Sequence, residues 1–173
     1  LKHSQKTKGT KVVVADPCRT RLAGEMNQHV PIRPGTEPFL LLGMLSAVVH
    51  GSWWDAQYIR DYTRNSEKLL DILGPWSPIR CAEICGVEPA ILSGIALKFS
   101  RSAMGLIHPG HGTFANANAL QGAWAWLALH TMTANTLRPG GLFEHAGVVD
   151  IQPLLSSIPS NSAPKTRVGA HSL

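Results

Sequence analysis

The stretch KVVVADPCRTR, residues 11–21, joins an apolar run to an acid and a turn, and PIRPGTE, residues 31–37, is a basic turn that also ends in an acid. Such a pair carries the polar groups that a nucleotide requires. Carboxylates accept hydrogen bonds from sugar hydroxyls or base N–H groups, while backbone N–H groups and Arg side chains bind phosphates. The two stretches therefore predict a nucleotide-binding corner.

The same stretches predict strands of a parallel sheet. Val12 to Ala15 are continuously apolar, which is typical of a strand covered on both faces. Asp16-Pro17 ends this strand because proline cannot donate to the ladder. Residues 30–33 suit a second short strand and residues 103–107 a third. Strands that alternate with helices indicate an α/β domain, and we expect a Rossmann-like parallel sheet with helices on both faces, incomplete in this chain.

From Pro38 onward, helical patterns dominate the sequence. Residues 39–49 are almost entirely apolar, which indicates a helix that is buried on most sides. Ser77-Pro78 predicts an N-cap followed by proline at the first helical position, and that helix is expected to end at Gly86. Further helices are expected over residues 20–26, 55–62, 67–73, 89–99 and 116–132.

Length and composition suggest one domain with a tail. The chain has 173 residues and is 44% hydrophobic, which is enough for one compact core. We expect a partial cofactor-binding α/β domain over residues 1–150. Residues 151–173 are rich in Ser, Pro and Asn and are expected to form a linker or irregular tail. The chain opens with Leu1 rather than Met and shows no signal peptide, so we expect a processed product or a piece of a longer protein.

Charge and apolar patterning restrict the partners. Residues 1–33 hold seven Lys and Arg against two acids, while the rest of the chain balances at nine against nine. An anionic ligand at the first corner and a solvated basic end are alternative explanations of this excess. The five Trp lie elsewhere, so we expect no nucleic-acid partner. No apolar run is long enough to cross a bilayer, so no direct membrane span is expected.

The sequence offers no residues that indicate catalysis or metal binding. Cys18, Cys81 and Cys85 form no disulfide framework, and Cys81 and Cys85 are expected to be buried structural residues. His108 and His111 have no third metal ligand nearby. There is no P-loop and no nucleophile elbow. We therefore expect a binding module, or part of an enzyme whose reactive centre lies elsewhere.

A second candidate loop is HPGHGTFA, residues 108–115. Its G-x-G-x-x-A spacing over residues 110–115 matches the loose dinucleotide fingerprint between an expected strand and an expected helix. The acid that this fingerprint requires is absent, because the next acid after Glu88 is Glu144. A tight strand-to-helix turn, an anion-binding loop and a NAD-binding loop remain as alternatives.

The first corner suits one base in particular. Guanine presents N–H donors on its base edge, including the N2 amino group, and a carboxylate accepts from two donors at once. Glu37 or Asp16 could serve as this carboxylate, and Gly35 would let the backbone approach the ligand closely. The alternative is an ordinary strand end with a solvated acid.

Taken in order, the motifs resemble those of a known family. They are VVVADPCRT, PIRPGTE, a leucine-rich helix, WDAQYIRDYT, CGVEPAILSGIALKFS, HPGHG and ALHTMTANTLRPGG. This order resembles the molybdopterin oxidoreductases of the dimethyl-sulfoxide-reductase superfamily, with the HPG loop closest to the polysulfide, thiosulfate and tetrathionate reductase branch. The resemblance covers residues 8–143, and the order of the motifs is more specific than any one of them.

The resemblance implies a role for the corner. In the family, the strand-end segment and a PGTD turn hold the guanosine end of one molybdopterin guanine dinucleotide. The matching residues here are Asp16, Pro17, Cys18, Arg19 and Thr20, together with Gly35, Thr36 and Glu37. The HPG loop would approach the pterin, which adds Gly110 and His111 as cofactor-binding candidates.

Several residues depart from the family pattern. Cys18 stands where the family often has Arg, and Asn27 and Glu37 stand where Asp is usual. Ala134 and Leu137 replace two glycines of the late TGN-x-G-x-PGG turn. Glu37 keeps the charge but adds a methylene, so its contact with the base is expected to shift.

The resemblance also implies cofactors and partners. The family carries a molybdenum or tungsten bis(molybdopterin guanine dinucleotide) centre, and a 4Fe–4S cluster is possible in the part that precedes this segment. We therefore expect a fragment of an oxidoreductase, inactive alone, that works with the remaining domains of the enzyme and an iron–sulfur electron-transfer subunit. The location could be periplasmic or cytoplasmic. The alternatives are a non-catalytic scaffold subunit of the same fold and a NAD-binding domain that uses the 110–115 loop.

Overall fold

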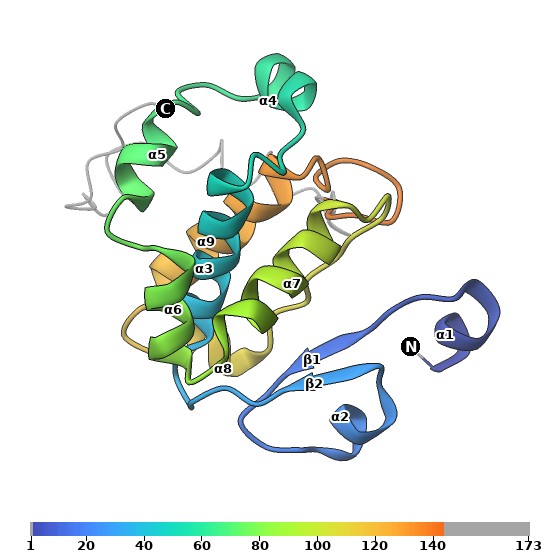
Figure 1. Cartoon of the computed structure of the whole chain (residues 1–173). Helices are drawn as coiled ribbons and strands as arrows, with labels where there is room; N and C mark the ends of the chain where they lie inside the picture. The colour runs from blue at the N-terminus through green and yellow to red at the C-terminus, as the bar shows by residue number, and fades with distance from the viewer. Residues whose placement is uncertain (1, 144–173) are drawn as a thin grey trace, which may run out of the picture. The chain divides into compact units, whose positions relative to one another are not determined.

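Helix α3 (Glu37–His50) is the central element of the computed structural model, which describes residues 2–143 (Figure 1). Eleven of its fourteen residues are buried, because its sequence is apolar on nearly every side. Helices α6 (Pro78–Cys85), α7 (Pro89–Ser100) and α9 (Ala119–Met132) all pack against it. The helix expected after Pro38, buried on most sides, is thus confirmed.

A glycine allows α3 to approach its neighbours closely. A Cβ placed on Gly43 would lie 2.6 Å from Cβ of Cys81 and 2.9 Å from a methyl of Leu92. Both of those side chains are fully buried, in α6 and α7 respectively. Any larger residue at position 43 would therefore push two core helices away from α3.

Helix α6 begins and ends as its sequence predicts. The Ser77 hydroxyl accepts a hydrogen bond from the Arg80 amide at 3.2 Å, and Pro78 occupies the first turn. Gly86 ends the helix with a φ of 71°, the left-handed conformation that glycine adopts without strain. Because the structure shows both caps, the expected boundaries of this helix are confirmed.

Two parallel strands precede the helical part. Strand β1 (Val13–Ala15), helix α2 (Arg21–Glu25) and strand β2 (Gln28–Val30) form a β–α–β unit, in which Ala15 pairs with Val30. This confirms a parallel strand pair that is joined by a helix. The second strand lies two residues earlier than expected, because Asn27 binds the amide of Val12 through its side chain and starts the pairing there.

The sheet is smaller and more open than the sequence predicts. Among the described residues only β1 and β2 form it, so the larger Rossmann-like sheet is not seen there. The prediction that β1 is covered on both faces is wrong for the described part, since Val13 is 38% exposed. The strand expected at residues 103–107 is also wrong: this segment forms no ladder and takes its hydrogen bonds from side chains of α9 and the turn that follows it.

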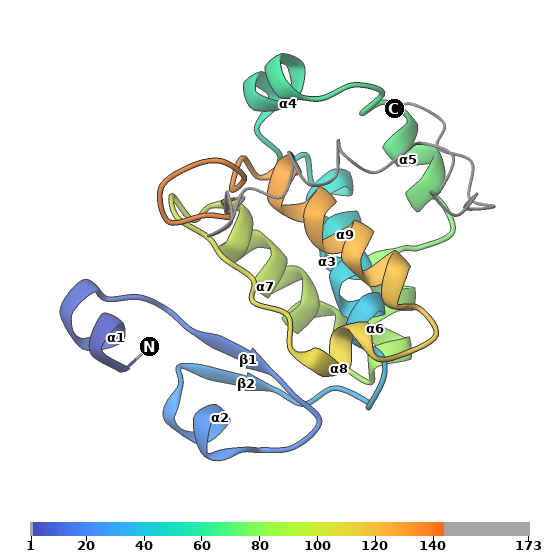
Figure 2. The same cartoon turned by 180° about the vertical axis from the view of Figure 1, so that it is seen from behind.

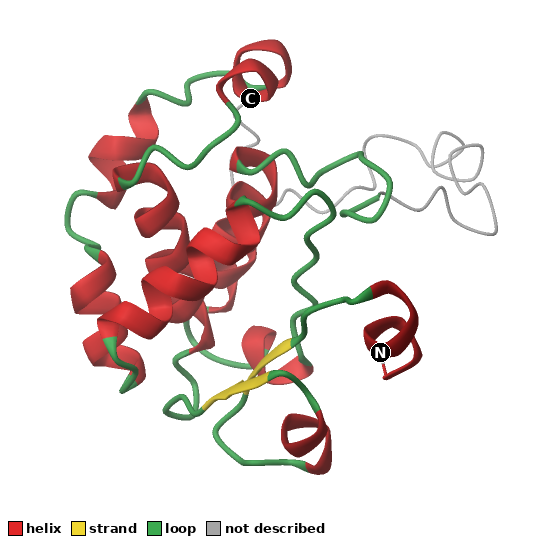
Figure 3. Ribbon diagram, turned by 45° about the vertical axis from the view of Figure 1, so that its right-hand side comes forward, coloured by secondary structure: helices red, strands yellow, loops and turns green. Residues whose placement is uncertain are grey.

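The remaining helices are short. They are α1 (Lys2–Lys8), α4 (Ala56–Tyr62), α5 (Lys68–Leu73) and α8 (His111–Phe114), and Figure 2 shows α9 and α8 from the opposite side. Figure 3 shows how far helix predominates over strand. Within residues 2–143, no helix combines the length and apolarity that crossing a membrane requires. The tail expected at residues 151–173 lies outside the described residues, as does the domain boundary expected at residue 150.

The turn after α9 keeps a backbone that glycine would favour. Ala134 has a φ of 54° and Leu137 a φ of 56°, and these are the two positions where the family pattern has glycine. A left-handed backbone brings Cβ close to the carbonyl oxygen that follows, so it is unfavourable for Ala and Leu. Ala134 is 3% exposed, whereas Leu137 is 62% exposed. Leu137 therefore has little packing to offset the strain.

Two cysteines lie in the core of the helical part. Cys81 and Cys85 are fully buried in α6, as expected, while Cys18 is exposed. Burial raises the pKa of both the Cys81 and the Cys85 thiol to about 11. Because the thiolate is the reactive species, neither buried cysteine is a nucleophile at neutral pH.

Glycine at the left-handed positions of the late turn should stabilise the protein. We expect Leu137→Gly to raise the free energy of unfolding by about 0.5–1 kcal/mol, because the relief of left-handed strain exceeds the entropy cost of glycine. Ala134→Gly should raise the free energy of unfolding by less, because the buried methyl group of Ala134 contributes packing that glycine would lose. Urea unfolding followed by far-UV circular dichroism measures both. Ala123→Gly, within α9, is the control and should destabilise by about 1 kcal/mol.

Thiol labelling should separate the three cysteines. With a disulfide reagent at pH 7.5, we expect one thiol per folded chain to react quickly and three to react after denaturation. The Cys18→Ser variant should show no fast reaction. Fast labelling of Cys81 or Cys85 in the folded chain would contradict the burial of these thiols.

Candidate functional site

The first corner is a hydrogen-bonded turn at the carboxyl end of β1. The Asp16 amide donates to the carbonyl of Val30 at 3.2 Å, which extends the pairing of the strands by one residue. The Asp16 carboxylate accepts from the Cys18 amide through Oδ1 at 2.8 Å, and His29 Nε2 lies 2.9 Å from the Asp16 carbonyl oxygen. These bonds fix the path of the chain directly after the strand.

The rest of this corner faces solvent. Pro17, Cys18, Arg19 and Thr20 are all exposed. Thr20 caps α2, because its hydroxyl accepts from the Ala23 amide at 3.2 Å. Arg19 has no hydrogen-bond or ion-pair partner among the described residues, so its guanidinium is available to an anion.

Three of the seven Lys and Arg in residues 1–33 have partners: Lys2, Arg21 and Arg33. Glu25 forms ion pairs with Lys2 at 2.7 Å and with Arg21 at 3.2 Å, and these two contacts lower the pKa of the Glu25 carboxyl. Arg33 donates through Nη1 to the carbonyls of Glu83 and Ile84, at 2.8 and 3.2 Å. Arg33 thus caps the carboxyl end of α6, a structural role that the sequence did not indicate.

The second corner is a tight turn bound to the helical core. The Thr36 amide donates to the Arg33 carbonyl at 3.2 Å, and Gly35 has a φ of 77°, which suits the third position of a type II turn. The Arg33 amide donates to the Cys85 carbonyl at 2.8 Å, and the Cys85 thiol lies 3.4 Å from the Thr36 carbonyl. The turn is therefore held directly against the end of α6.

Glu37 is the unusual residue of this turn. It begins α3, and its Oε2 atom is buried without a hydrogen-bond partner among the described residues. A buried carboxylate oxygen without a donor is costly, so such an atom in a folded protein requires an explanation. A Cβ placed on Gly112 would lie 4.0 Å from Oε1 of Glu37, so the 108–115 loop comes close to this carboxylate.

The 108–115 loop ends in a single helical turn. Gly110 is the N-cap of α8, and a Cβ there would meet no atom within 4 Å. His108 and His111 are exposed. The described residues contain no group of three His, Cys, Asp or Glu that could hold a metal ion. Asn116 closes the loop by donating to the carbonyls of Gly112 and Thr113, at 3.2 and 3.0 Å.

The structure brings some of the predicted residues together. Asp16 and the Arg33–Glu37 turn leave the same end of the parallel pair, because Ala15 is paired with Val30. Glu37 lies beside the 108–115 loop. No hydrogen bond or ion pair joins Asp16 to Glu37 in the part of the chain that is described. Their shared contact with one ligand therefore stays a prediction.

Two hollows in the described part of the chain lie away from this corner. One of about 400 Å³ is bordered by residues 53–55, the end of α7 and the late turn, and another of about 180 Å³ lies beside α5. Neither is lined by any of the ten predicted cofactor-binding residues.

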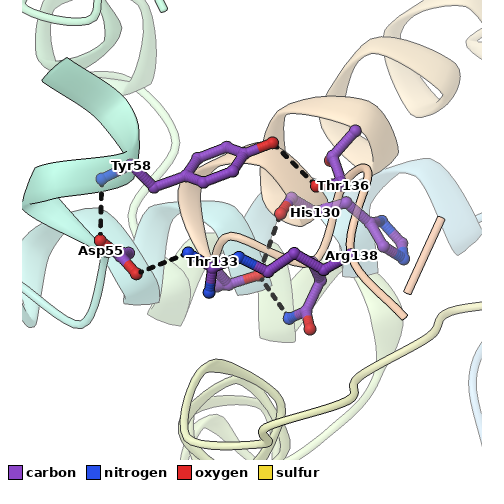
Figure 4. Close-up of polar contacts among 7 residues, drawn as sticks. Asp55, Tyr58, His130, Thr133, Thr136 and Arg138 are labelled. Atoms are coloured by element: carbon purple, nitrogen blue, oxygen red, sulfur yellow. Dashed lines mark hydrogen bonds and ion pairs between the residues drawn. The ribbon is translucent and has the colours of Figure 1, made fainter. Parts of the chain in front are cut away.

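Sequence reasoning missed a set of polar contacts (Figure 4), and three of the residues drawn there, Asp55, Thr133 and Arg138, line the larger hollow. Asp55 caps α4 by accepting from the Tyr58 amide at 2.9 Å and lies 3.6 Å from the Arg138 guanidinium. The Tyr58 hydroxyl donates to the Thr136 carbonyl at 2.8 Å, and Arg138 lies over the Tyr58 ring. The WDAQYIRDYT and RPGG motifs are thus in contact, although they are far apart in the sequence.

Comparison with known proteins gives related sequences. No family model matches the chain. The F420-dependent formate dehydrogenase subunit alpha of Methanocaldococcus jannaschii is 32% identical over 87 residues, which are 50% of this chain and 13% of the relative. The dimethyl sulfoxide/trimethylamine N-oxide reductase of Rhodobacter capsulatus is 29% identical over 145 residues, covering 80% of this chain and 18% of the relative.

A solved structure also has the same fold. The acetylene hydratase of Pelobacter acetylenicus superposes with a TM-score of 0.73 at 25% identity, over 78% of this chain and 18% of that chain. The chain thus spans less than a fifth of the length of each of these proteins. The branch suggested by the HPG loop stays a prediction, because these proteins act on different substrates. This chain is homologous to the molybdopterin oxidoreductases of the dimethyl-sulfoxide-reductase superfamily and corresponds to a segment of those longer enzymes.

Proposed function

We propose that this chain is the segment of a molybdenum- or tungsten-dependent oxidoreductase that holds the guanosine end of a molybdopterin guanine dinucleotide. The nucleotide would lie at the corner formed by residues 16–20 and 35–37, with Gly110 and His111 nearer the pterin. The metal–pterin group supplies the redox chemistry when bound, and this segment supplies binding and orientation. No residue in it is proposed to make or break bonds.

The observation that carries the proposal is the unpartnered carboxylate oxygen of Glu37. A guanine edge presents N–H donors, and a carboxylate accepts two of them at once. Oε2 is covered by protein atoms and has no donor among the described residues, so a guanine edge would reach it after a shift of the atoms that cover it. Glycine at position 112 keeps a side chain away from this carboxylate.

Asp16 and Arg19 fit the remainder of a nucleotide. Only Oδ1 of Asp16 has a partner within the described residues, so its second oxygen can accept from a sugar hydroxyl. The exposed Arg19 guanidinium suits a phosphate, because it presents paired N–H donors. Thr20 and Thr36 are held by their own turns, which keeps the backbone of both corners in place.

The longer enzyme would need further parts. We propose that the remaining domains supply the metal ligand and the second half of a bis(molybdopterin guanine dinucleotide) site. A 4Fe–4S cluster and an iron–sulfur electron-transfer subunit would then connect the metal to an external redox partner. Val13 on β1 is 38% exposed, which suits a strand that other parts of a longer protein cover.

The two alternatives gain less support. A NAD-binding loop at residues 110–115 requires a strand before it and a helix after it, yet residues 103–107 form no strand and α8 has only four residues. A non-catalytic scaffold subunit of the same fold offers no ligand for the buried Oε2 atom of Glu37. The Glu37 carboxylate therefore favours the cofactor-holding segment.

Titration calorimetry with GDP and with NADH tests the proposal on the 173-residue chain. We expect GDP to bind and NADH not to bind. Glu37→Gln should weaken GDP binding by about tenfold or more, because a hydrogen bond to a charged acceptor contributes about 1.5–3 kcal/mol. The matched control is Glu67→Gln, an exposed acid at the start of α5, which should bind GDP as the wild type does.

Two results would contradict the proposal. One is NADH binding in the micromolar range without GDP binding. The other is an unchanged affinity for GDP in the Glu37→Gln variant, which would mean that the carboxylate does not contact the base. Asp16→Asn should weaken binding less than Glu37→Gln, since a sugar hydroxyl also finds partners in water.

A further inference from the structure

The segment before the 108–115 loop is held by side chains in place of a strand. The Ile107 amide donates to Nε2 of His130 at 3.1 Å, and the Ile107 carbonyl accepts from Nε1 of Trp126 at 2.8 Å. Both backbone polar groups of one residue are therefore satisfied by two residues one turn apart on α9. A neighbouring strand would normally supply these partners.

These contacts determine the protonation state of His130. Because the Ile107 amide is a donor, Nε2 must be the unprotonated nitrogen. Nδ1 then carries the proton and donates to the Trp126 carbonyl at 2.8 Å. His130 is fully buried, and the rings of Phe99 and Trp126 meet it edge-on. Burial lowers its pKa, and no charged residue contributes to this shift.

A second contact fixes the same segment two residues earlier. The Gly105 amide donates to Oδ1 of Asn135 at 2.9 Å, and Asn135 is 3% exposed. The backbone N–H of Asn135 in turn donates to the backbone carbonyl of His130 at 2.8 Å. Residues 105 and 107 are thus attached to one polar network at the end of α9, directly before the loop begins.

We propose that His130, in its neutral form with the proton on Nδ1, is a positioning residue that sets where the 108–112 loop meets Glu37. The inference rests on the proposed function in one respect, that this loop borders the nucleotide site. The path is short: His130 holds Ile107, and five residues later Gly112 lies beside the Glu37 carboxylate. An apolar residue of similar size would fill the same space but leave the Ile107 amide without a partner.

Amide hydrogen exchange, measured by NMR on the full chain, tests this directly. In His130→Leu we expect the Ile107 amide to exchange about tenfold faster, because one net hydrogen bond is lost. The amides of residues 108–112 should lose protection from exchange in the same variant. His130→Gln should restore most of the protection, since its side-chain oxygen can replace Nε2 as the acceptor. If His130→Leu does not fold, Trp126→Phe tests the attachment of Ile107 to α9 by removing the Nε1 donor to the Ile107 carbonyl.

Met132→Ala is the matched control, because it removes a buried side chain from α9 that makes no hydrogen bond to Ile107 within residues 2–143. The two variants are compared at an equal loss of Tm. If Met132→Ala raises the amide exchange rates of residues 105–112 as much as His130→Leu does, His130 only fills the core and the proposal is wrong. Failure of His130→Gln to protect Ile107 better than His130→Leu would also overturn it.

A second measurement separates this inference from the proposed function. In the wild type GDP should protect the amides of residues 108–112, and His130→Leu should weaken GDP binding about three- to tenfold while Met132→Ala leaves it unchanged. If wild-type chain does not bind GDP at all, the proposed function fails. The exchange of the Ile107 amide then still decides whether His130 positions the loop.

Discussion

The structure depends on one constraint: helix α3 has almost no face that can be left in water. Leu45 and Val48 are fully buried, and α6, α7 and α9 must all pack around the helix to cover it. The hydrophobic effect therefore fixes the position of Glu37, because this residue begins the helix. The acidic turn is attached to the core and is not a free loop. Arg33 strengthens the attachment by binding the end of α6.

Local patterns in the sequence predicted the elements that are stabilised locally. Ser77, Pro78 and Gly86 set the ends of α6 through contacts within a few residues, and the apolar run after Pro38 requires a buried helix in any packing. The segment 103–107 has the composition of a strand, but composition does not say which partner its backbone takes. His130 and Trp126 provide that partner from about twenty residues away, and a short-range pattern does not contain this information.

The candidate site was predictable in its residue types but not in its geometry. The acids at positions 16 and 37 are predicted from their strand-end and turn contexts, and their contact with one ligand stays a prediction. The sequence did not reveal that one oxygen of Glu37 is buried without a donor, or that Gly112 lies beside it. It also could not separate Arg19, which has no partner among the described residues, from Arg33, which caps α6. Burial and partner choice are properties of the packed chain.

The late turn combines a left-handed backbone at two residues that are not glycine with hydrogen bonds that hold it in place. Ala134 and Leu137 keep the left-handed conformation on either side of residues 135–136. The Asn135 side chain accepts from the Gly105 amide and donates to the Thr133 hydroxyl, while the backbone carbonyl of Asn135 accepts from the Leu142 amide at 2.7 Å. These contacts hold the turn in one conformation, and an unfavourable φ angle persists where the surrounding structure fixes the backbone in this way. The same Asn135 bonds tie the turn to the segment that leads into the 108–112 loop. A change of turn conformation would therefore reach the loop beside Glu37, so strain at positions 134 and 137 is tolerated where a different backbone would not be.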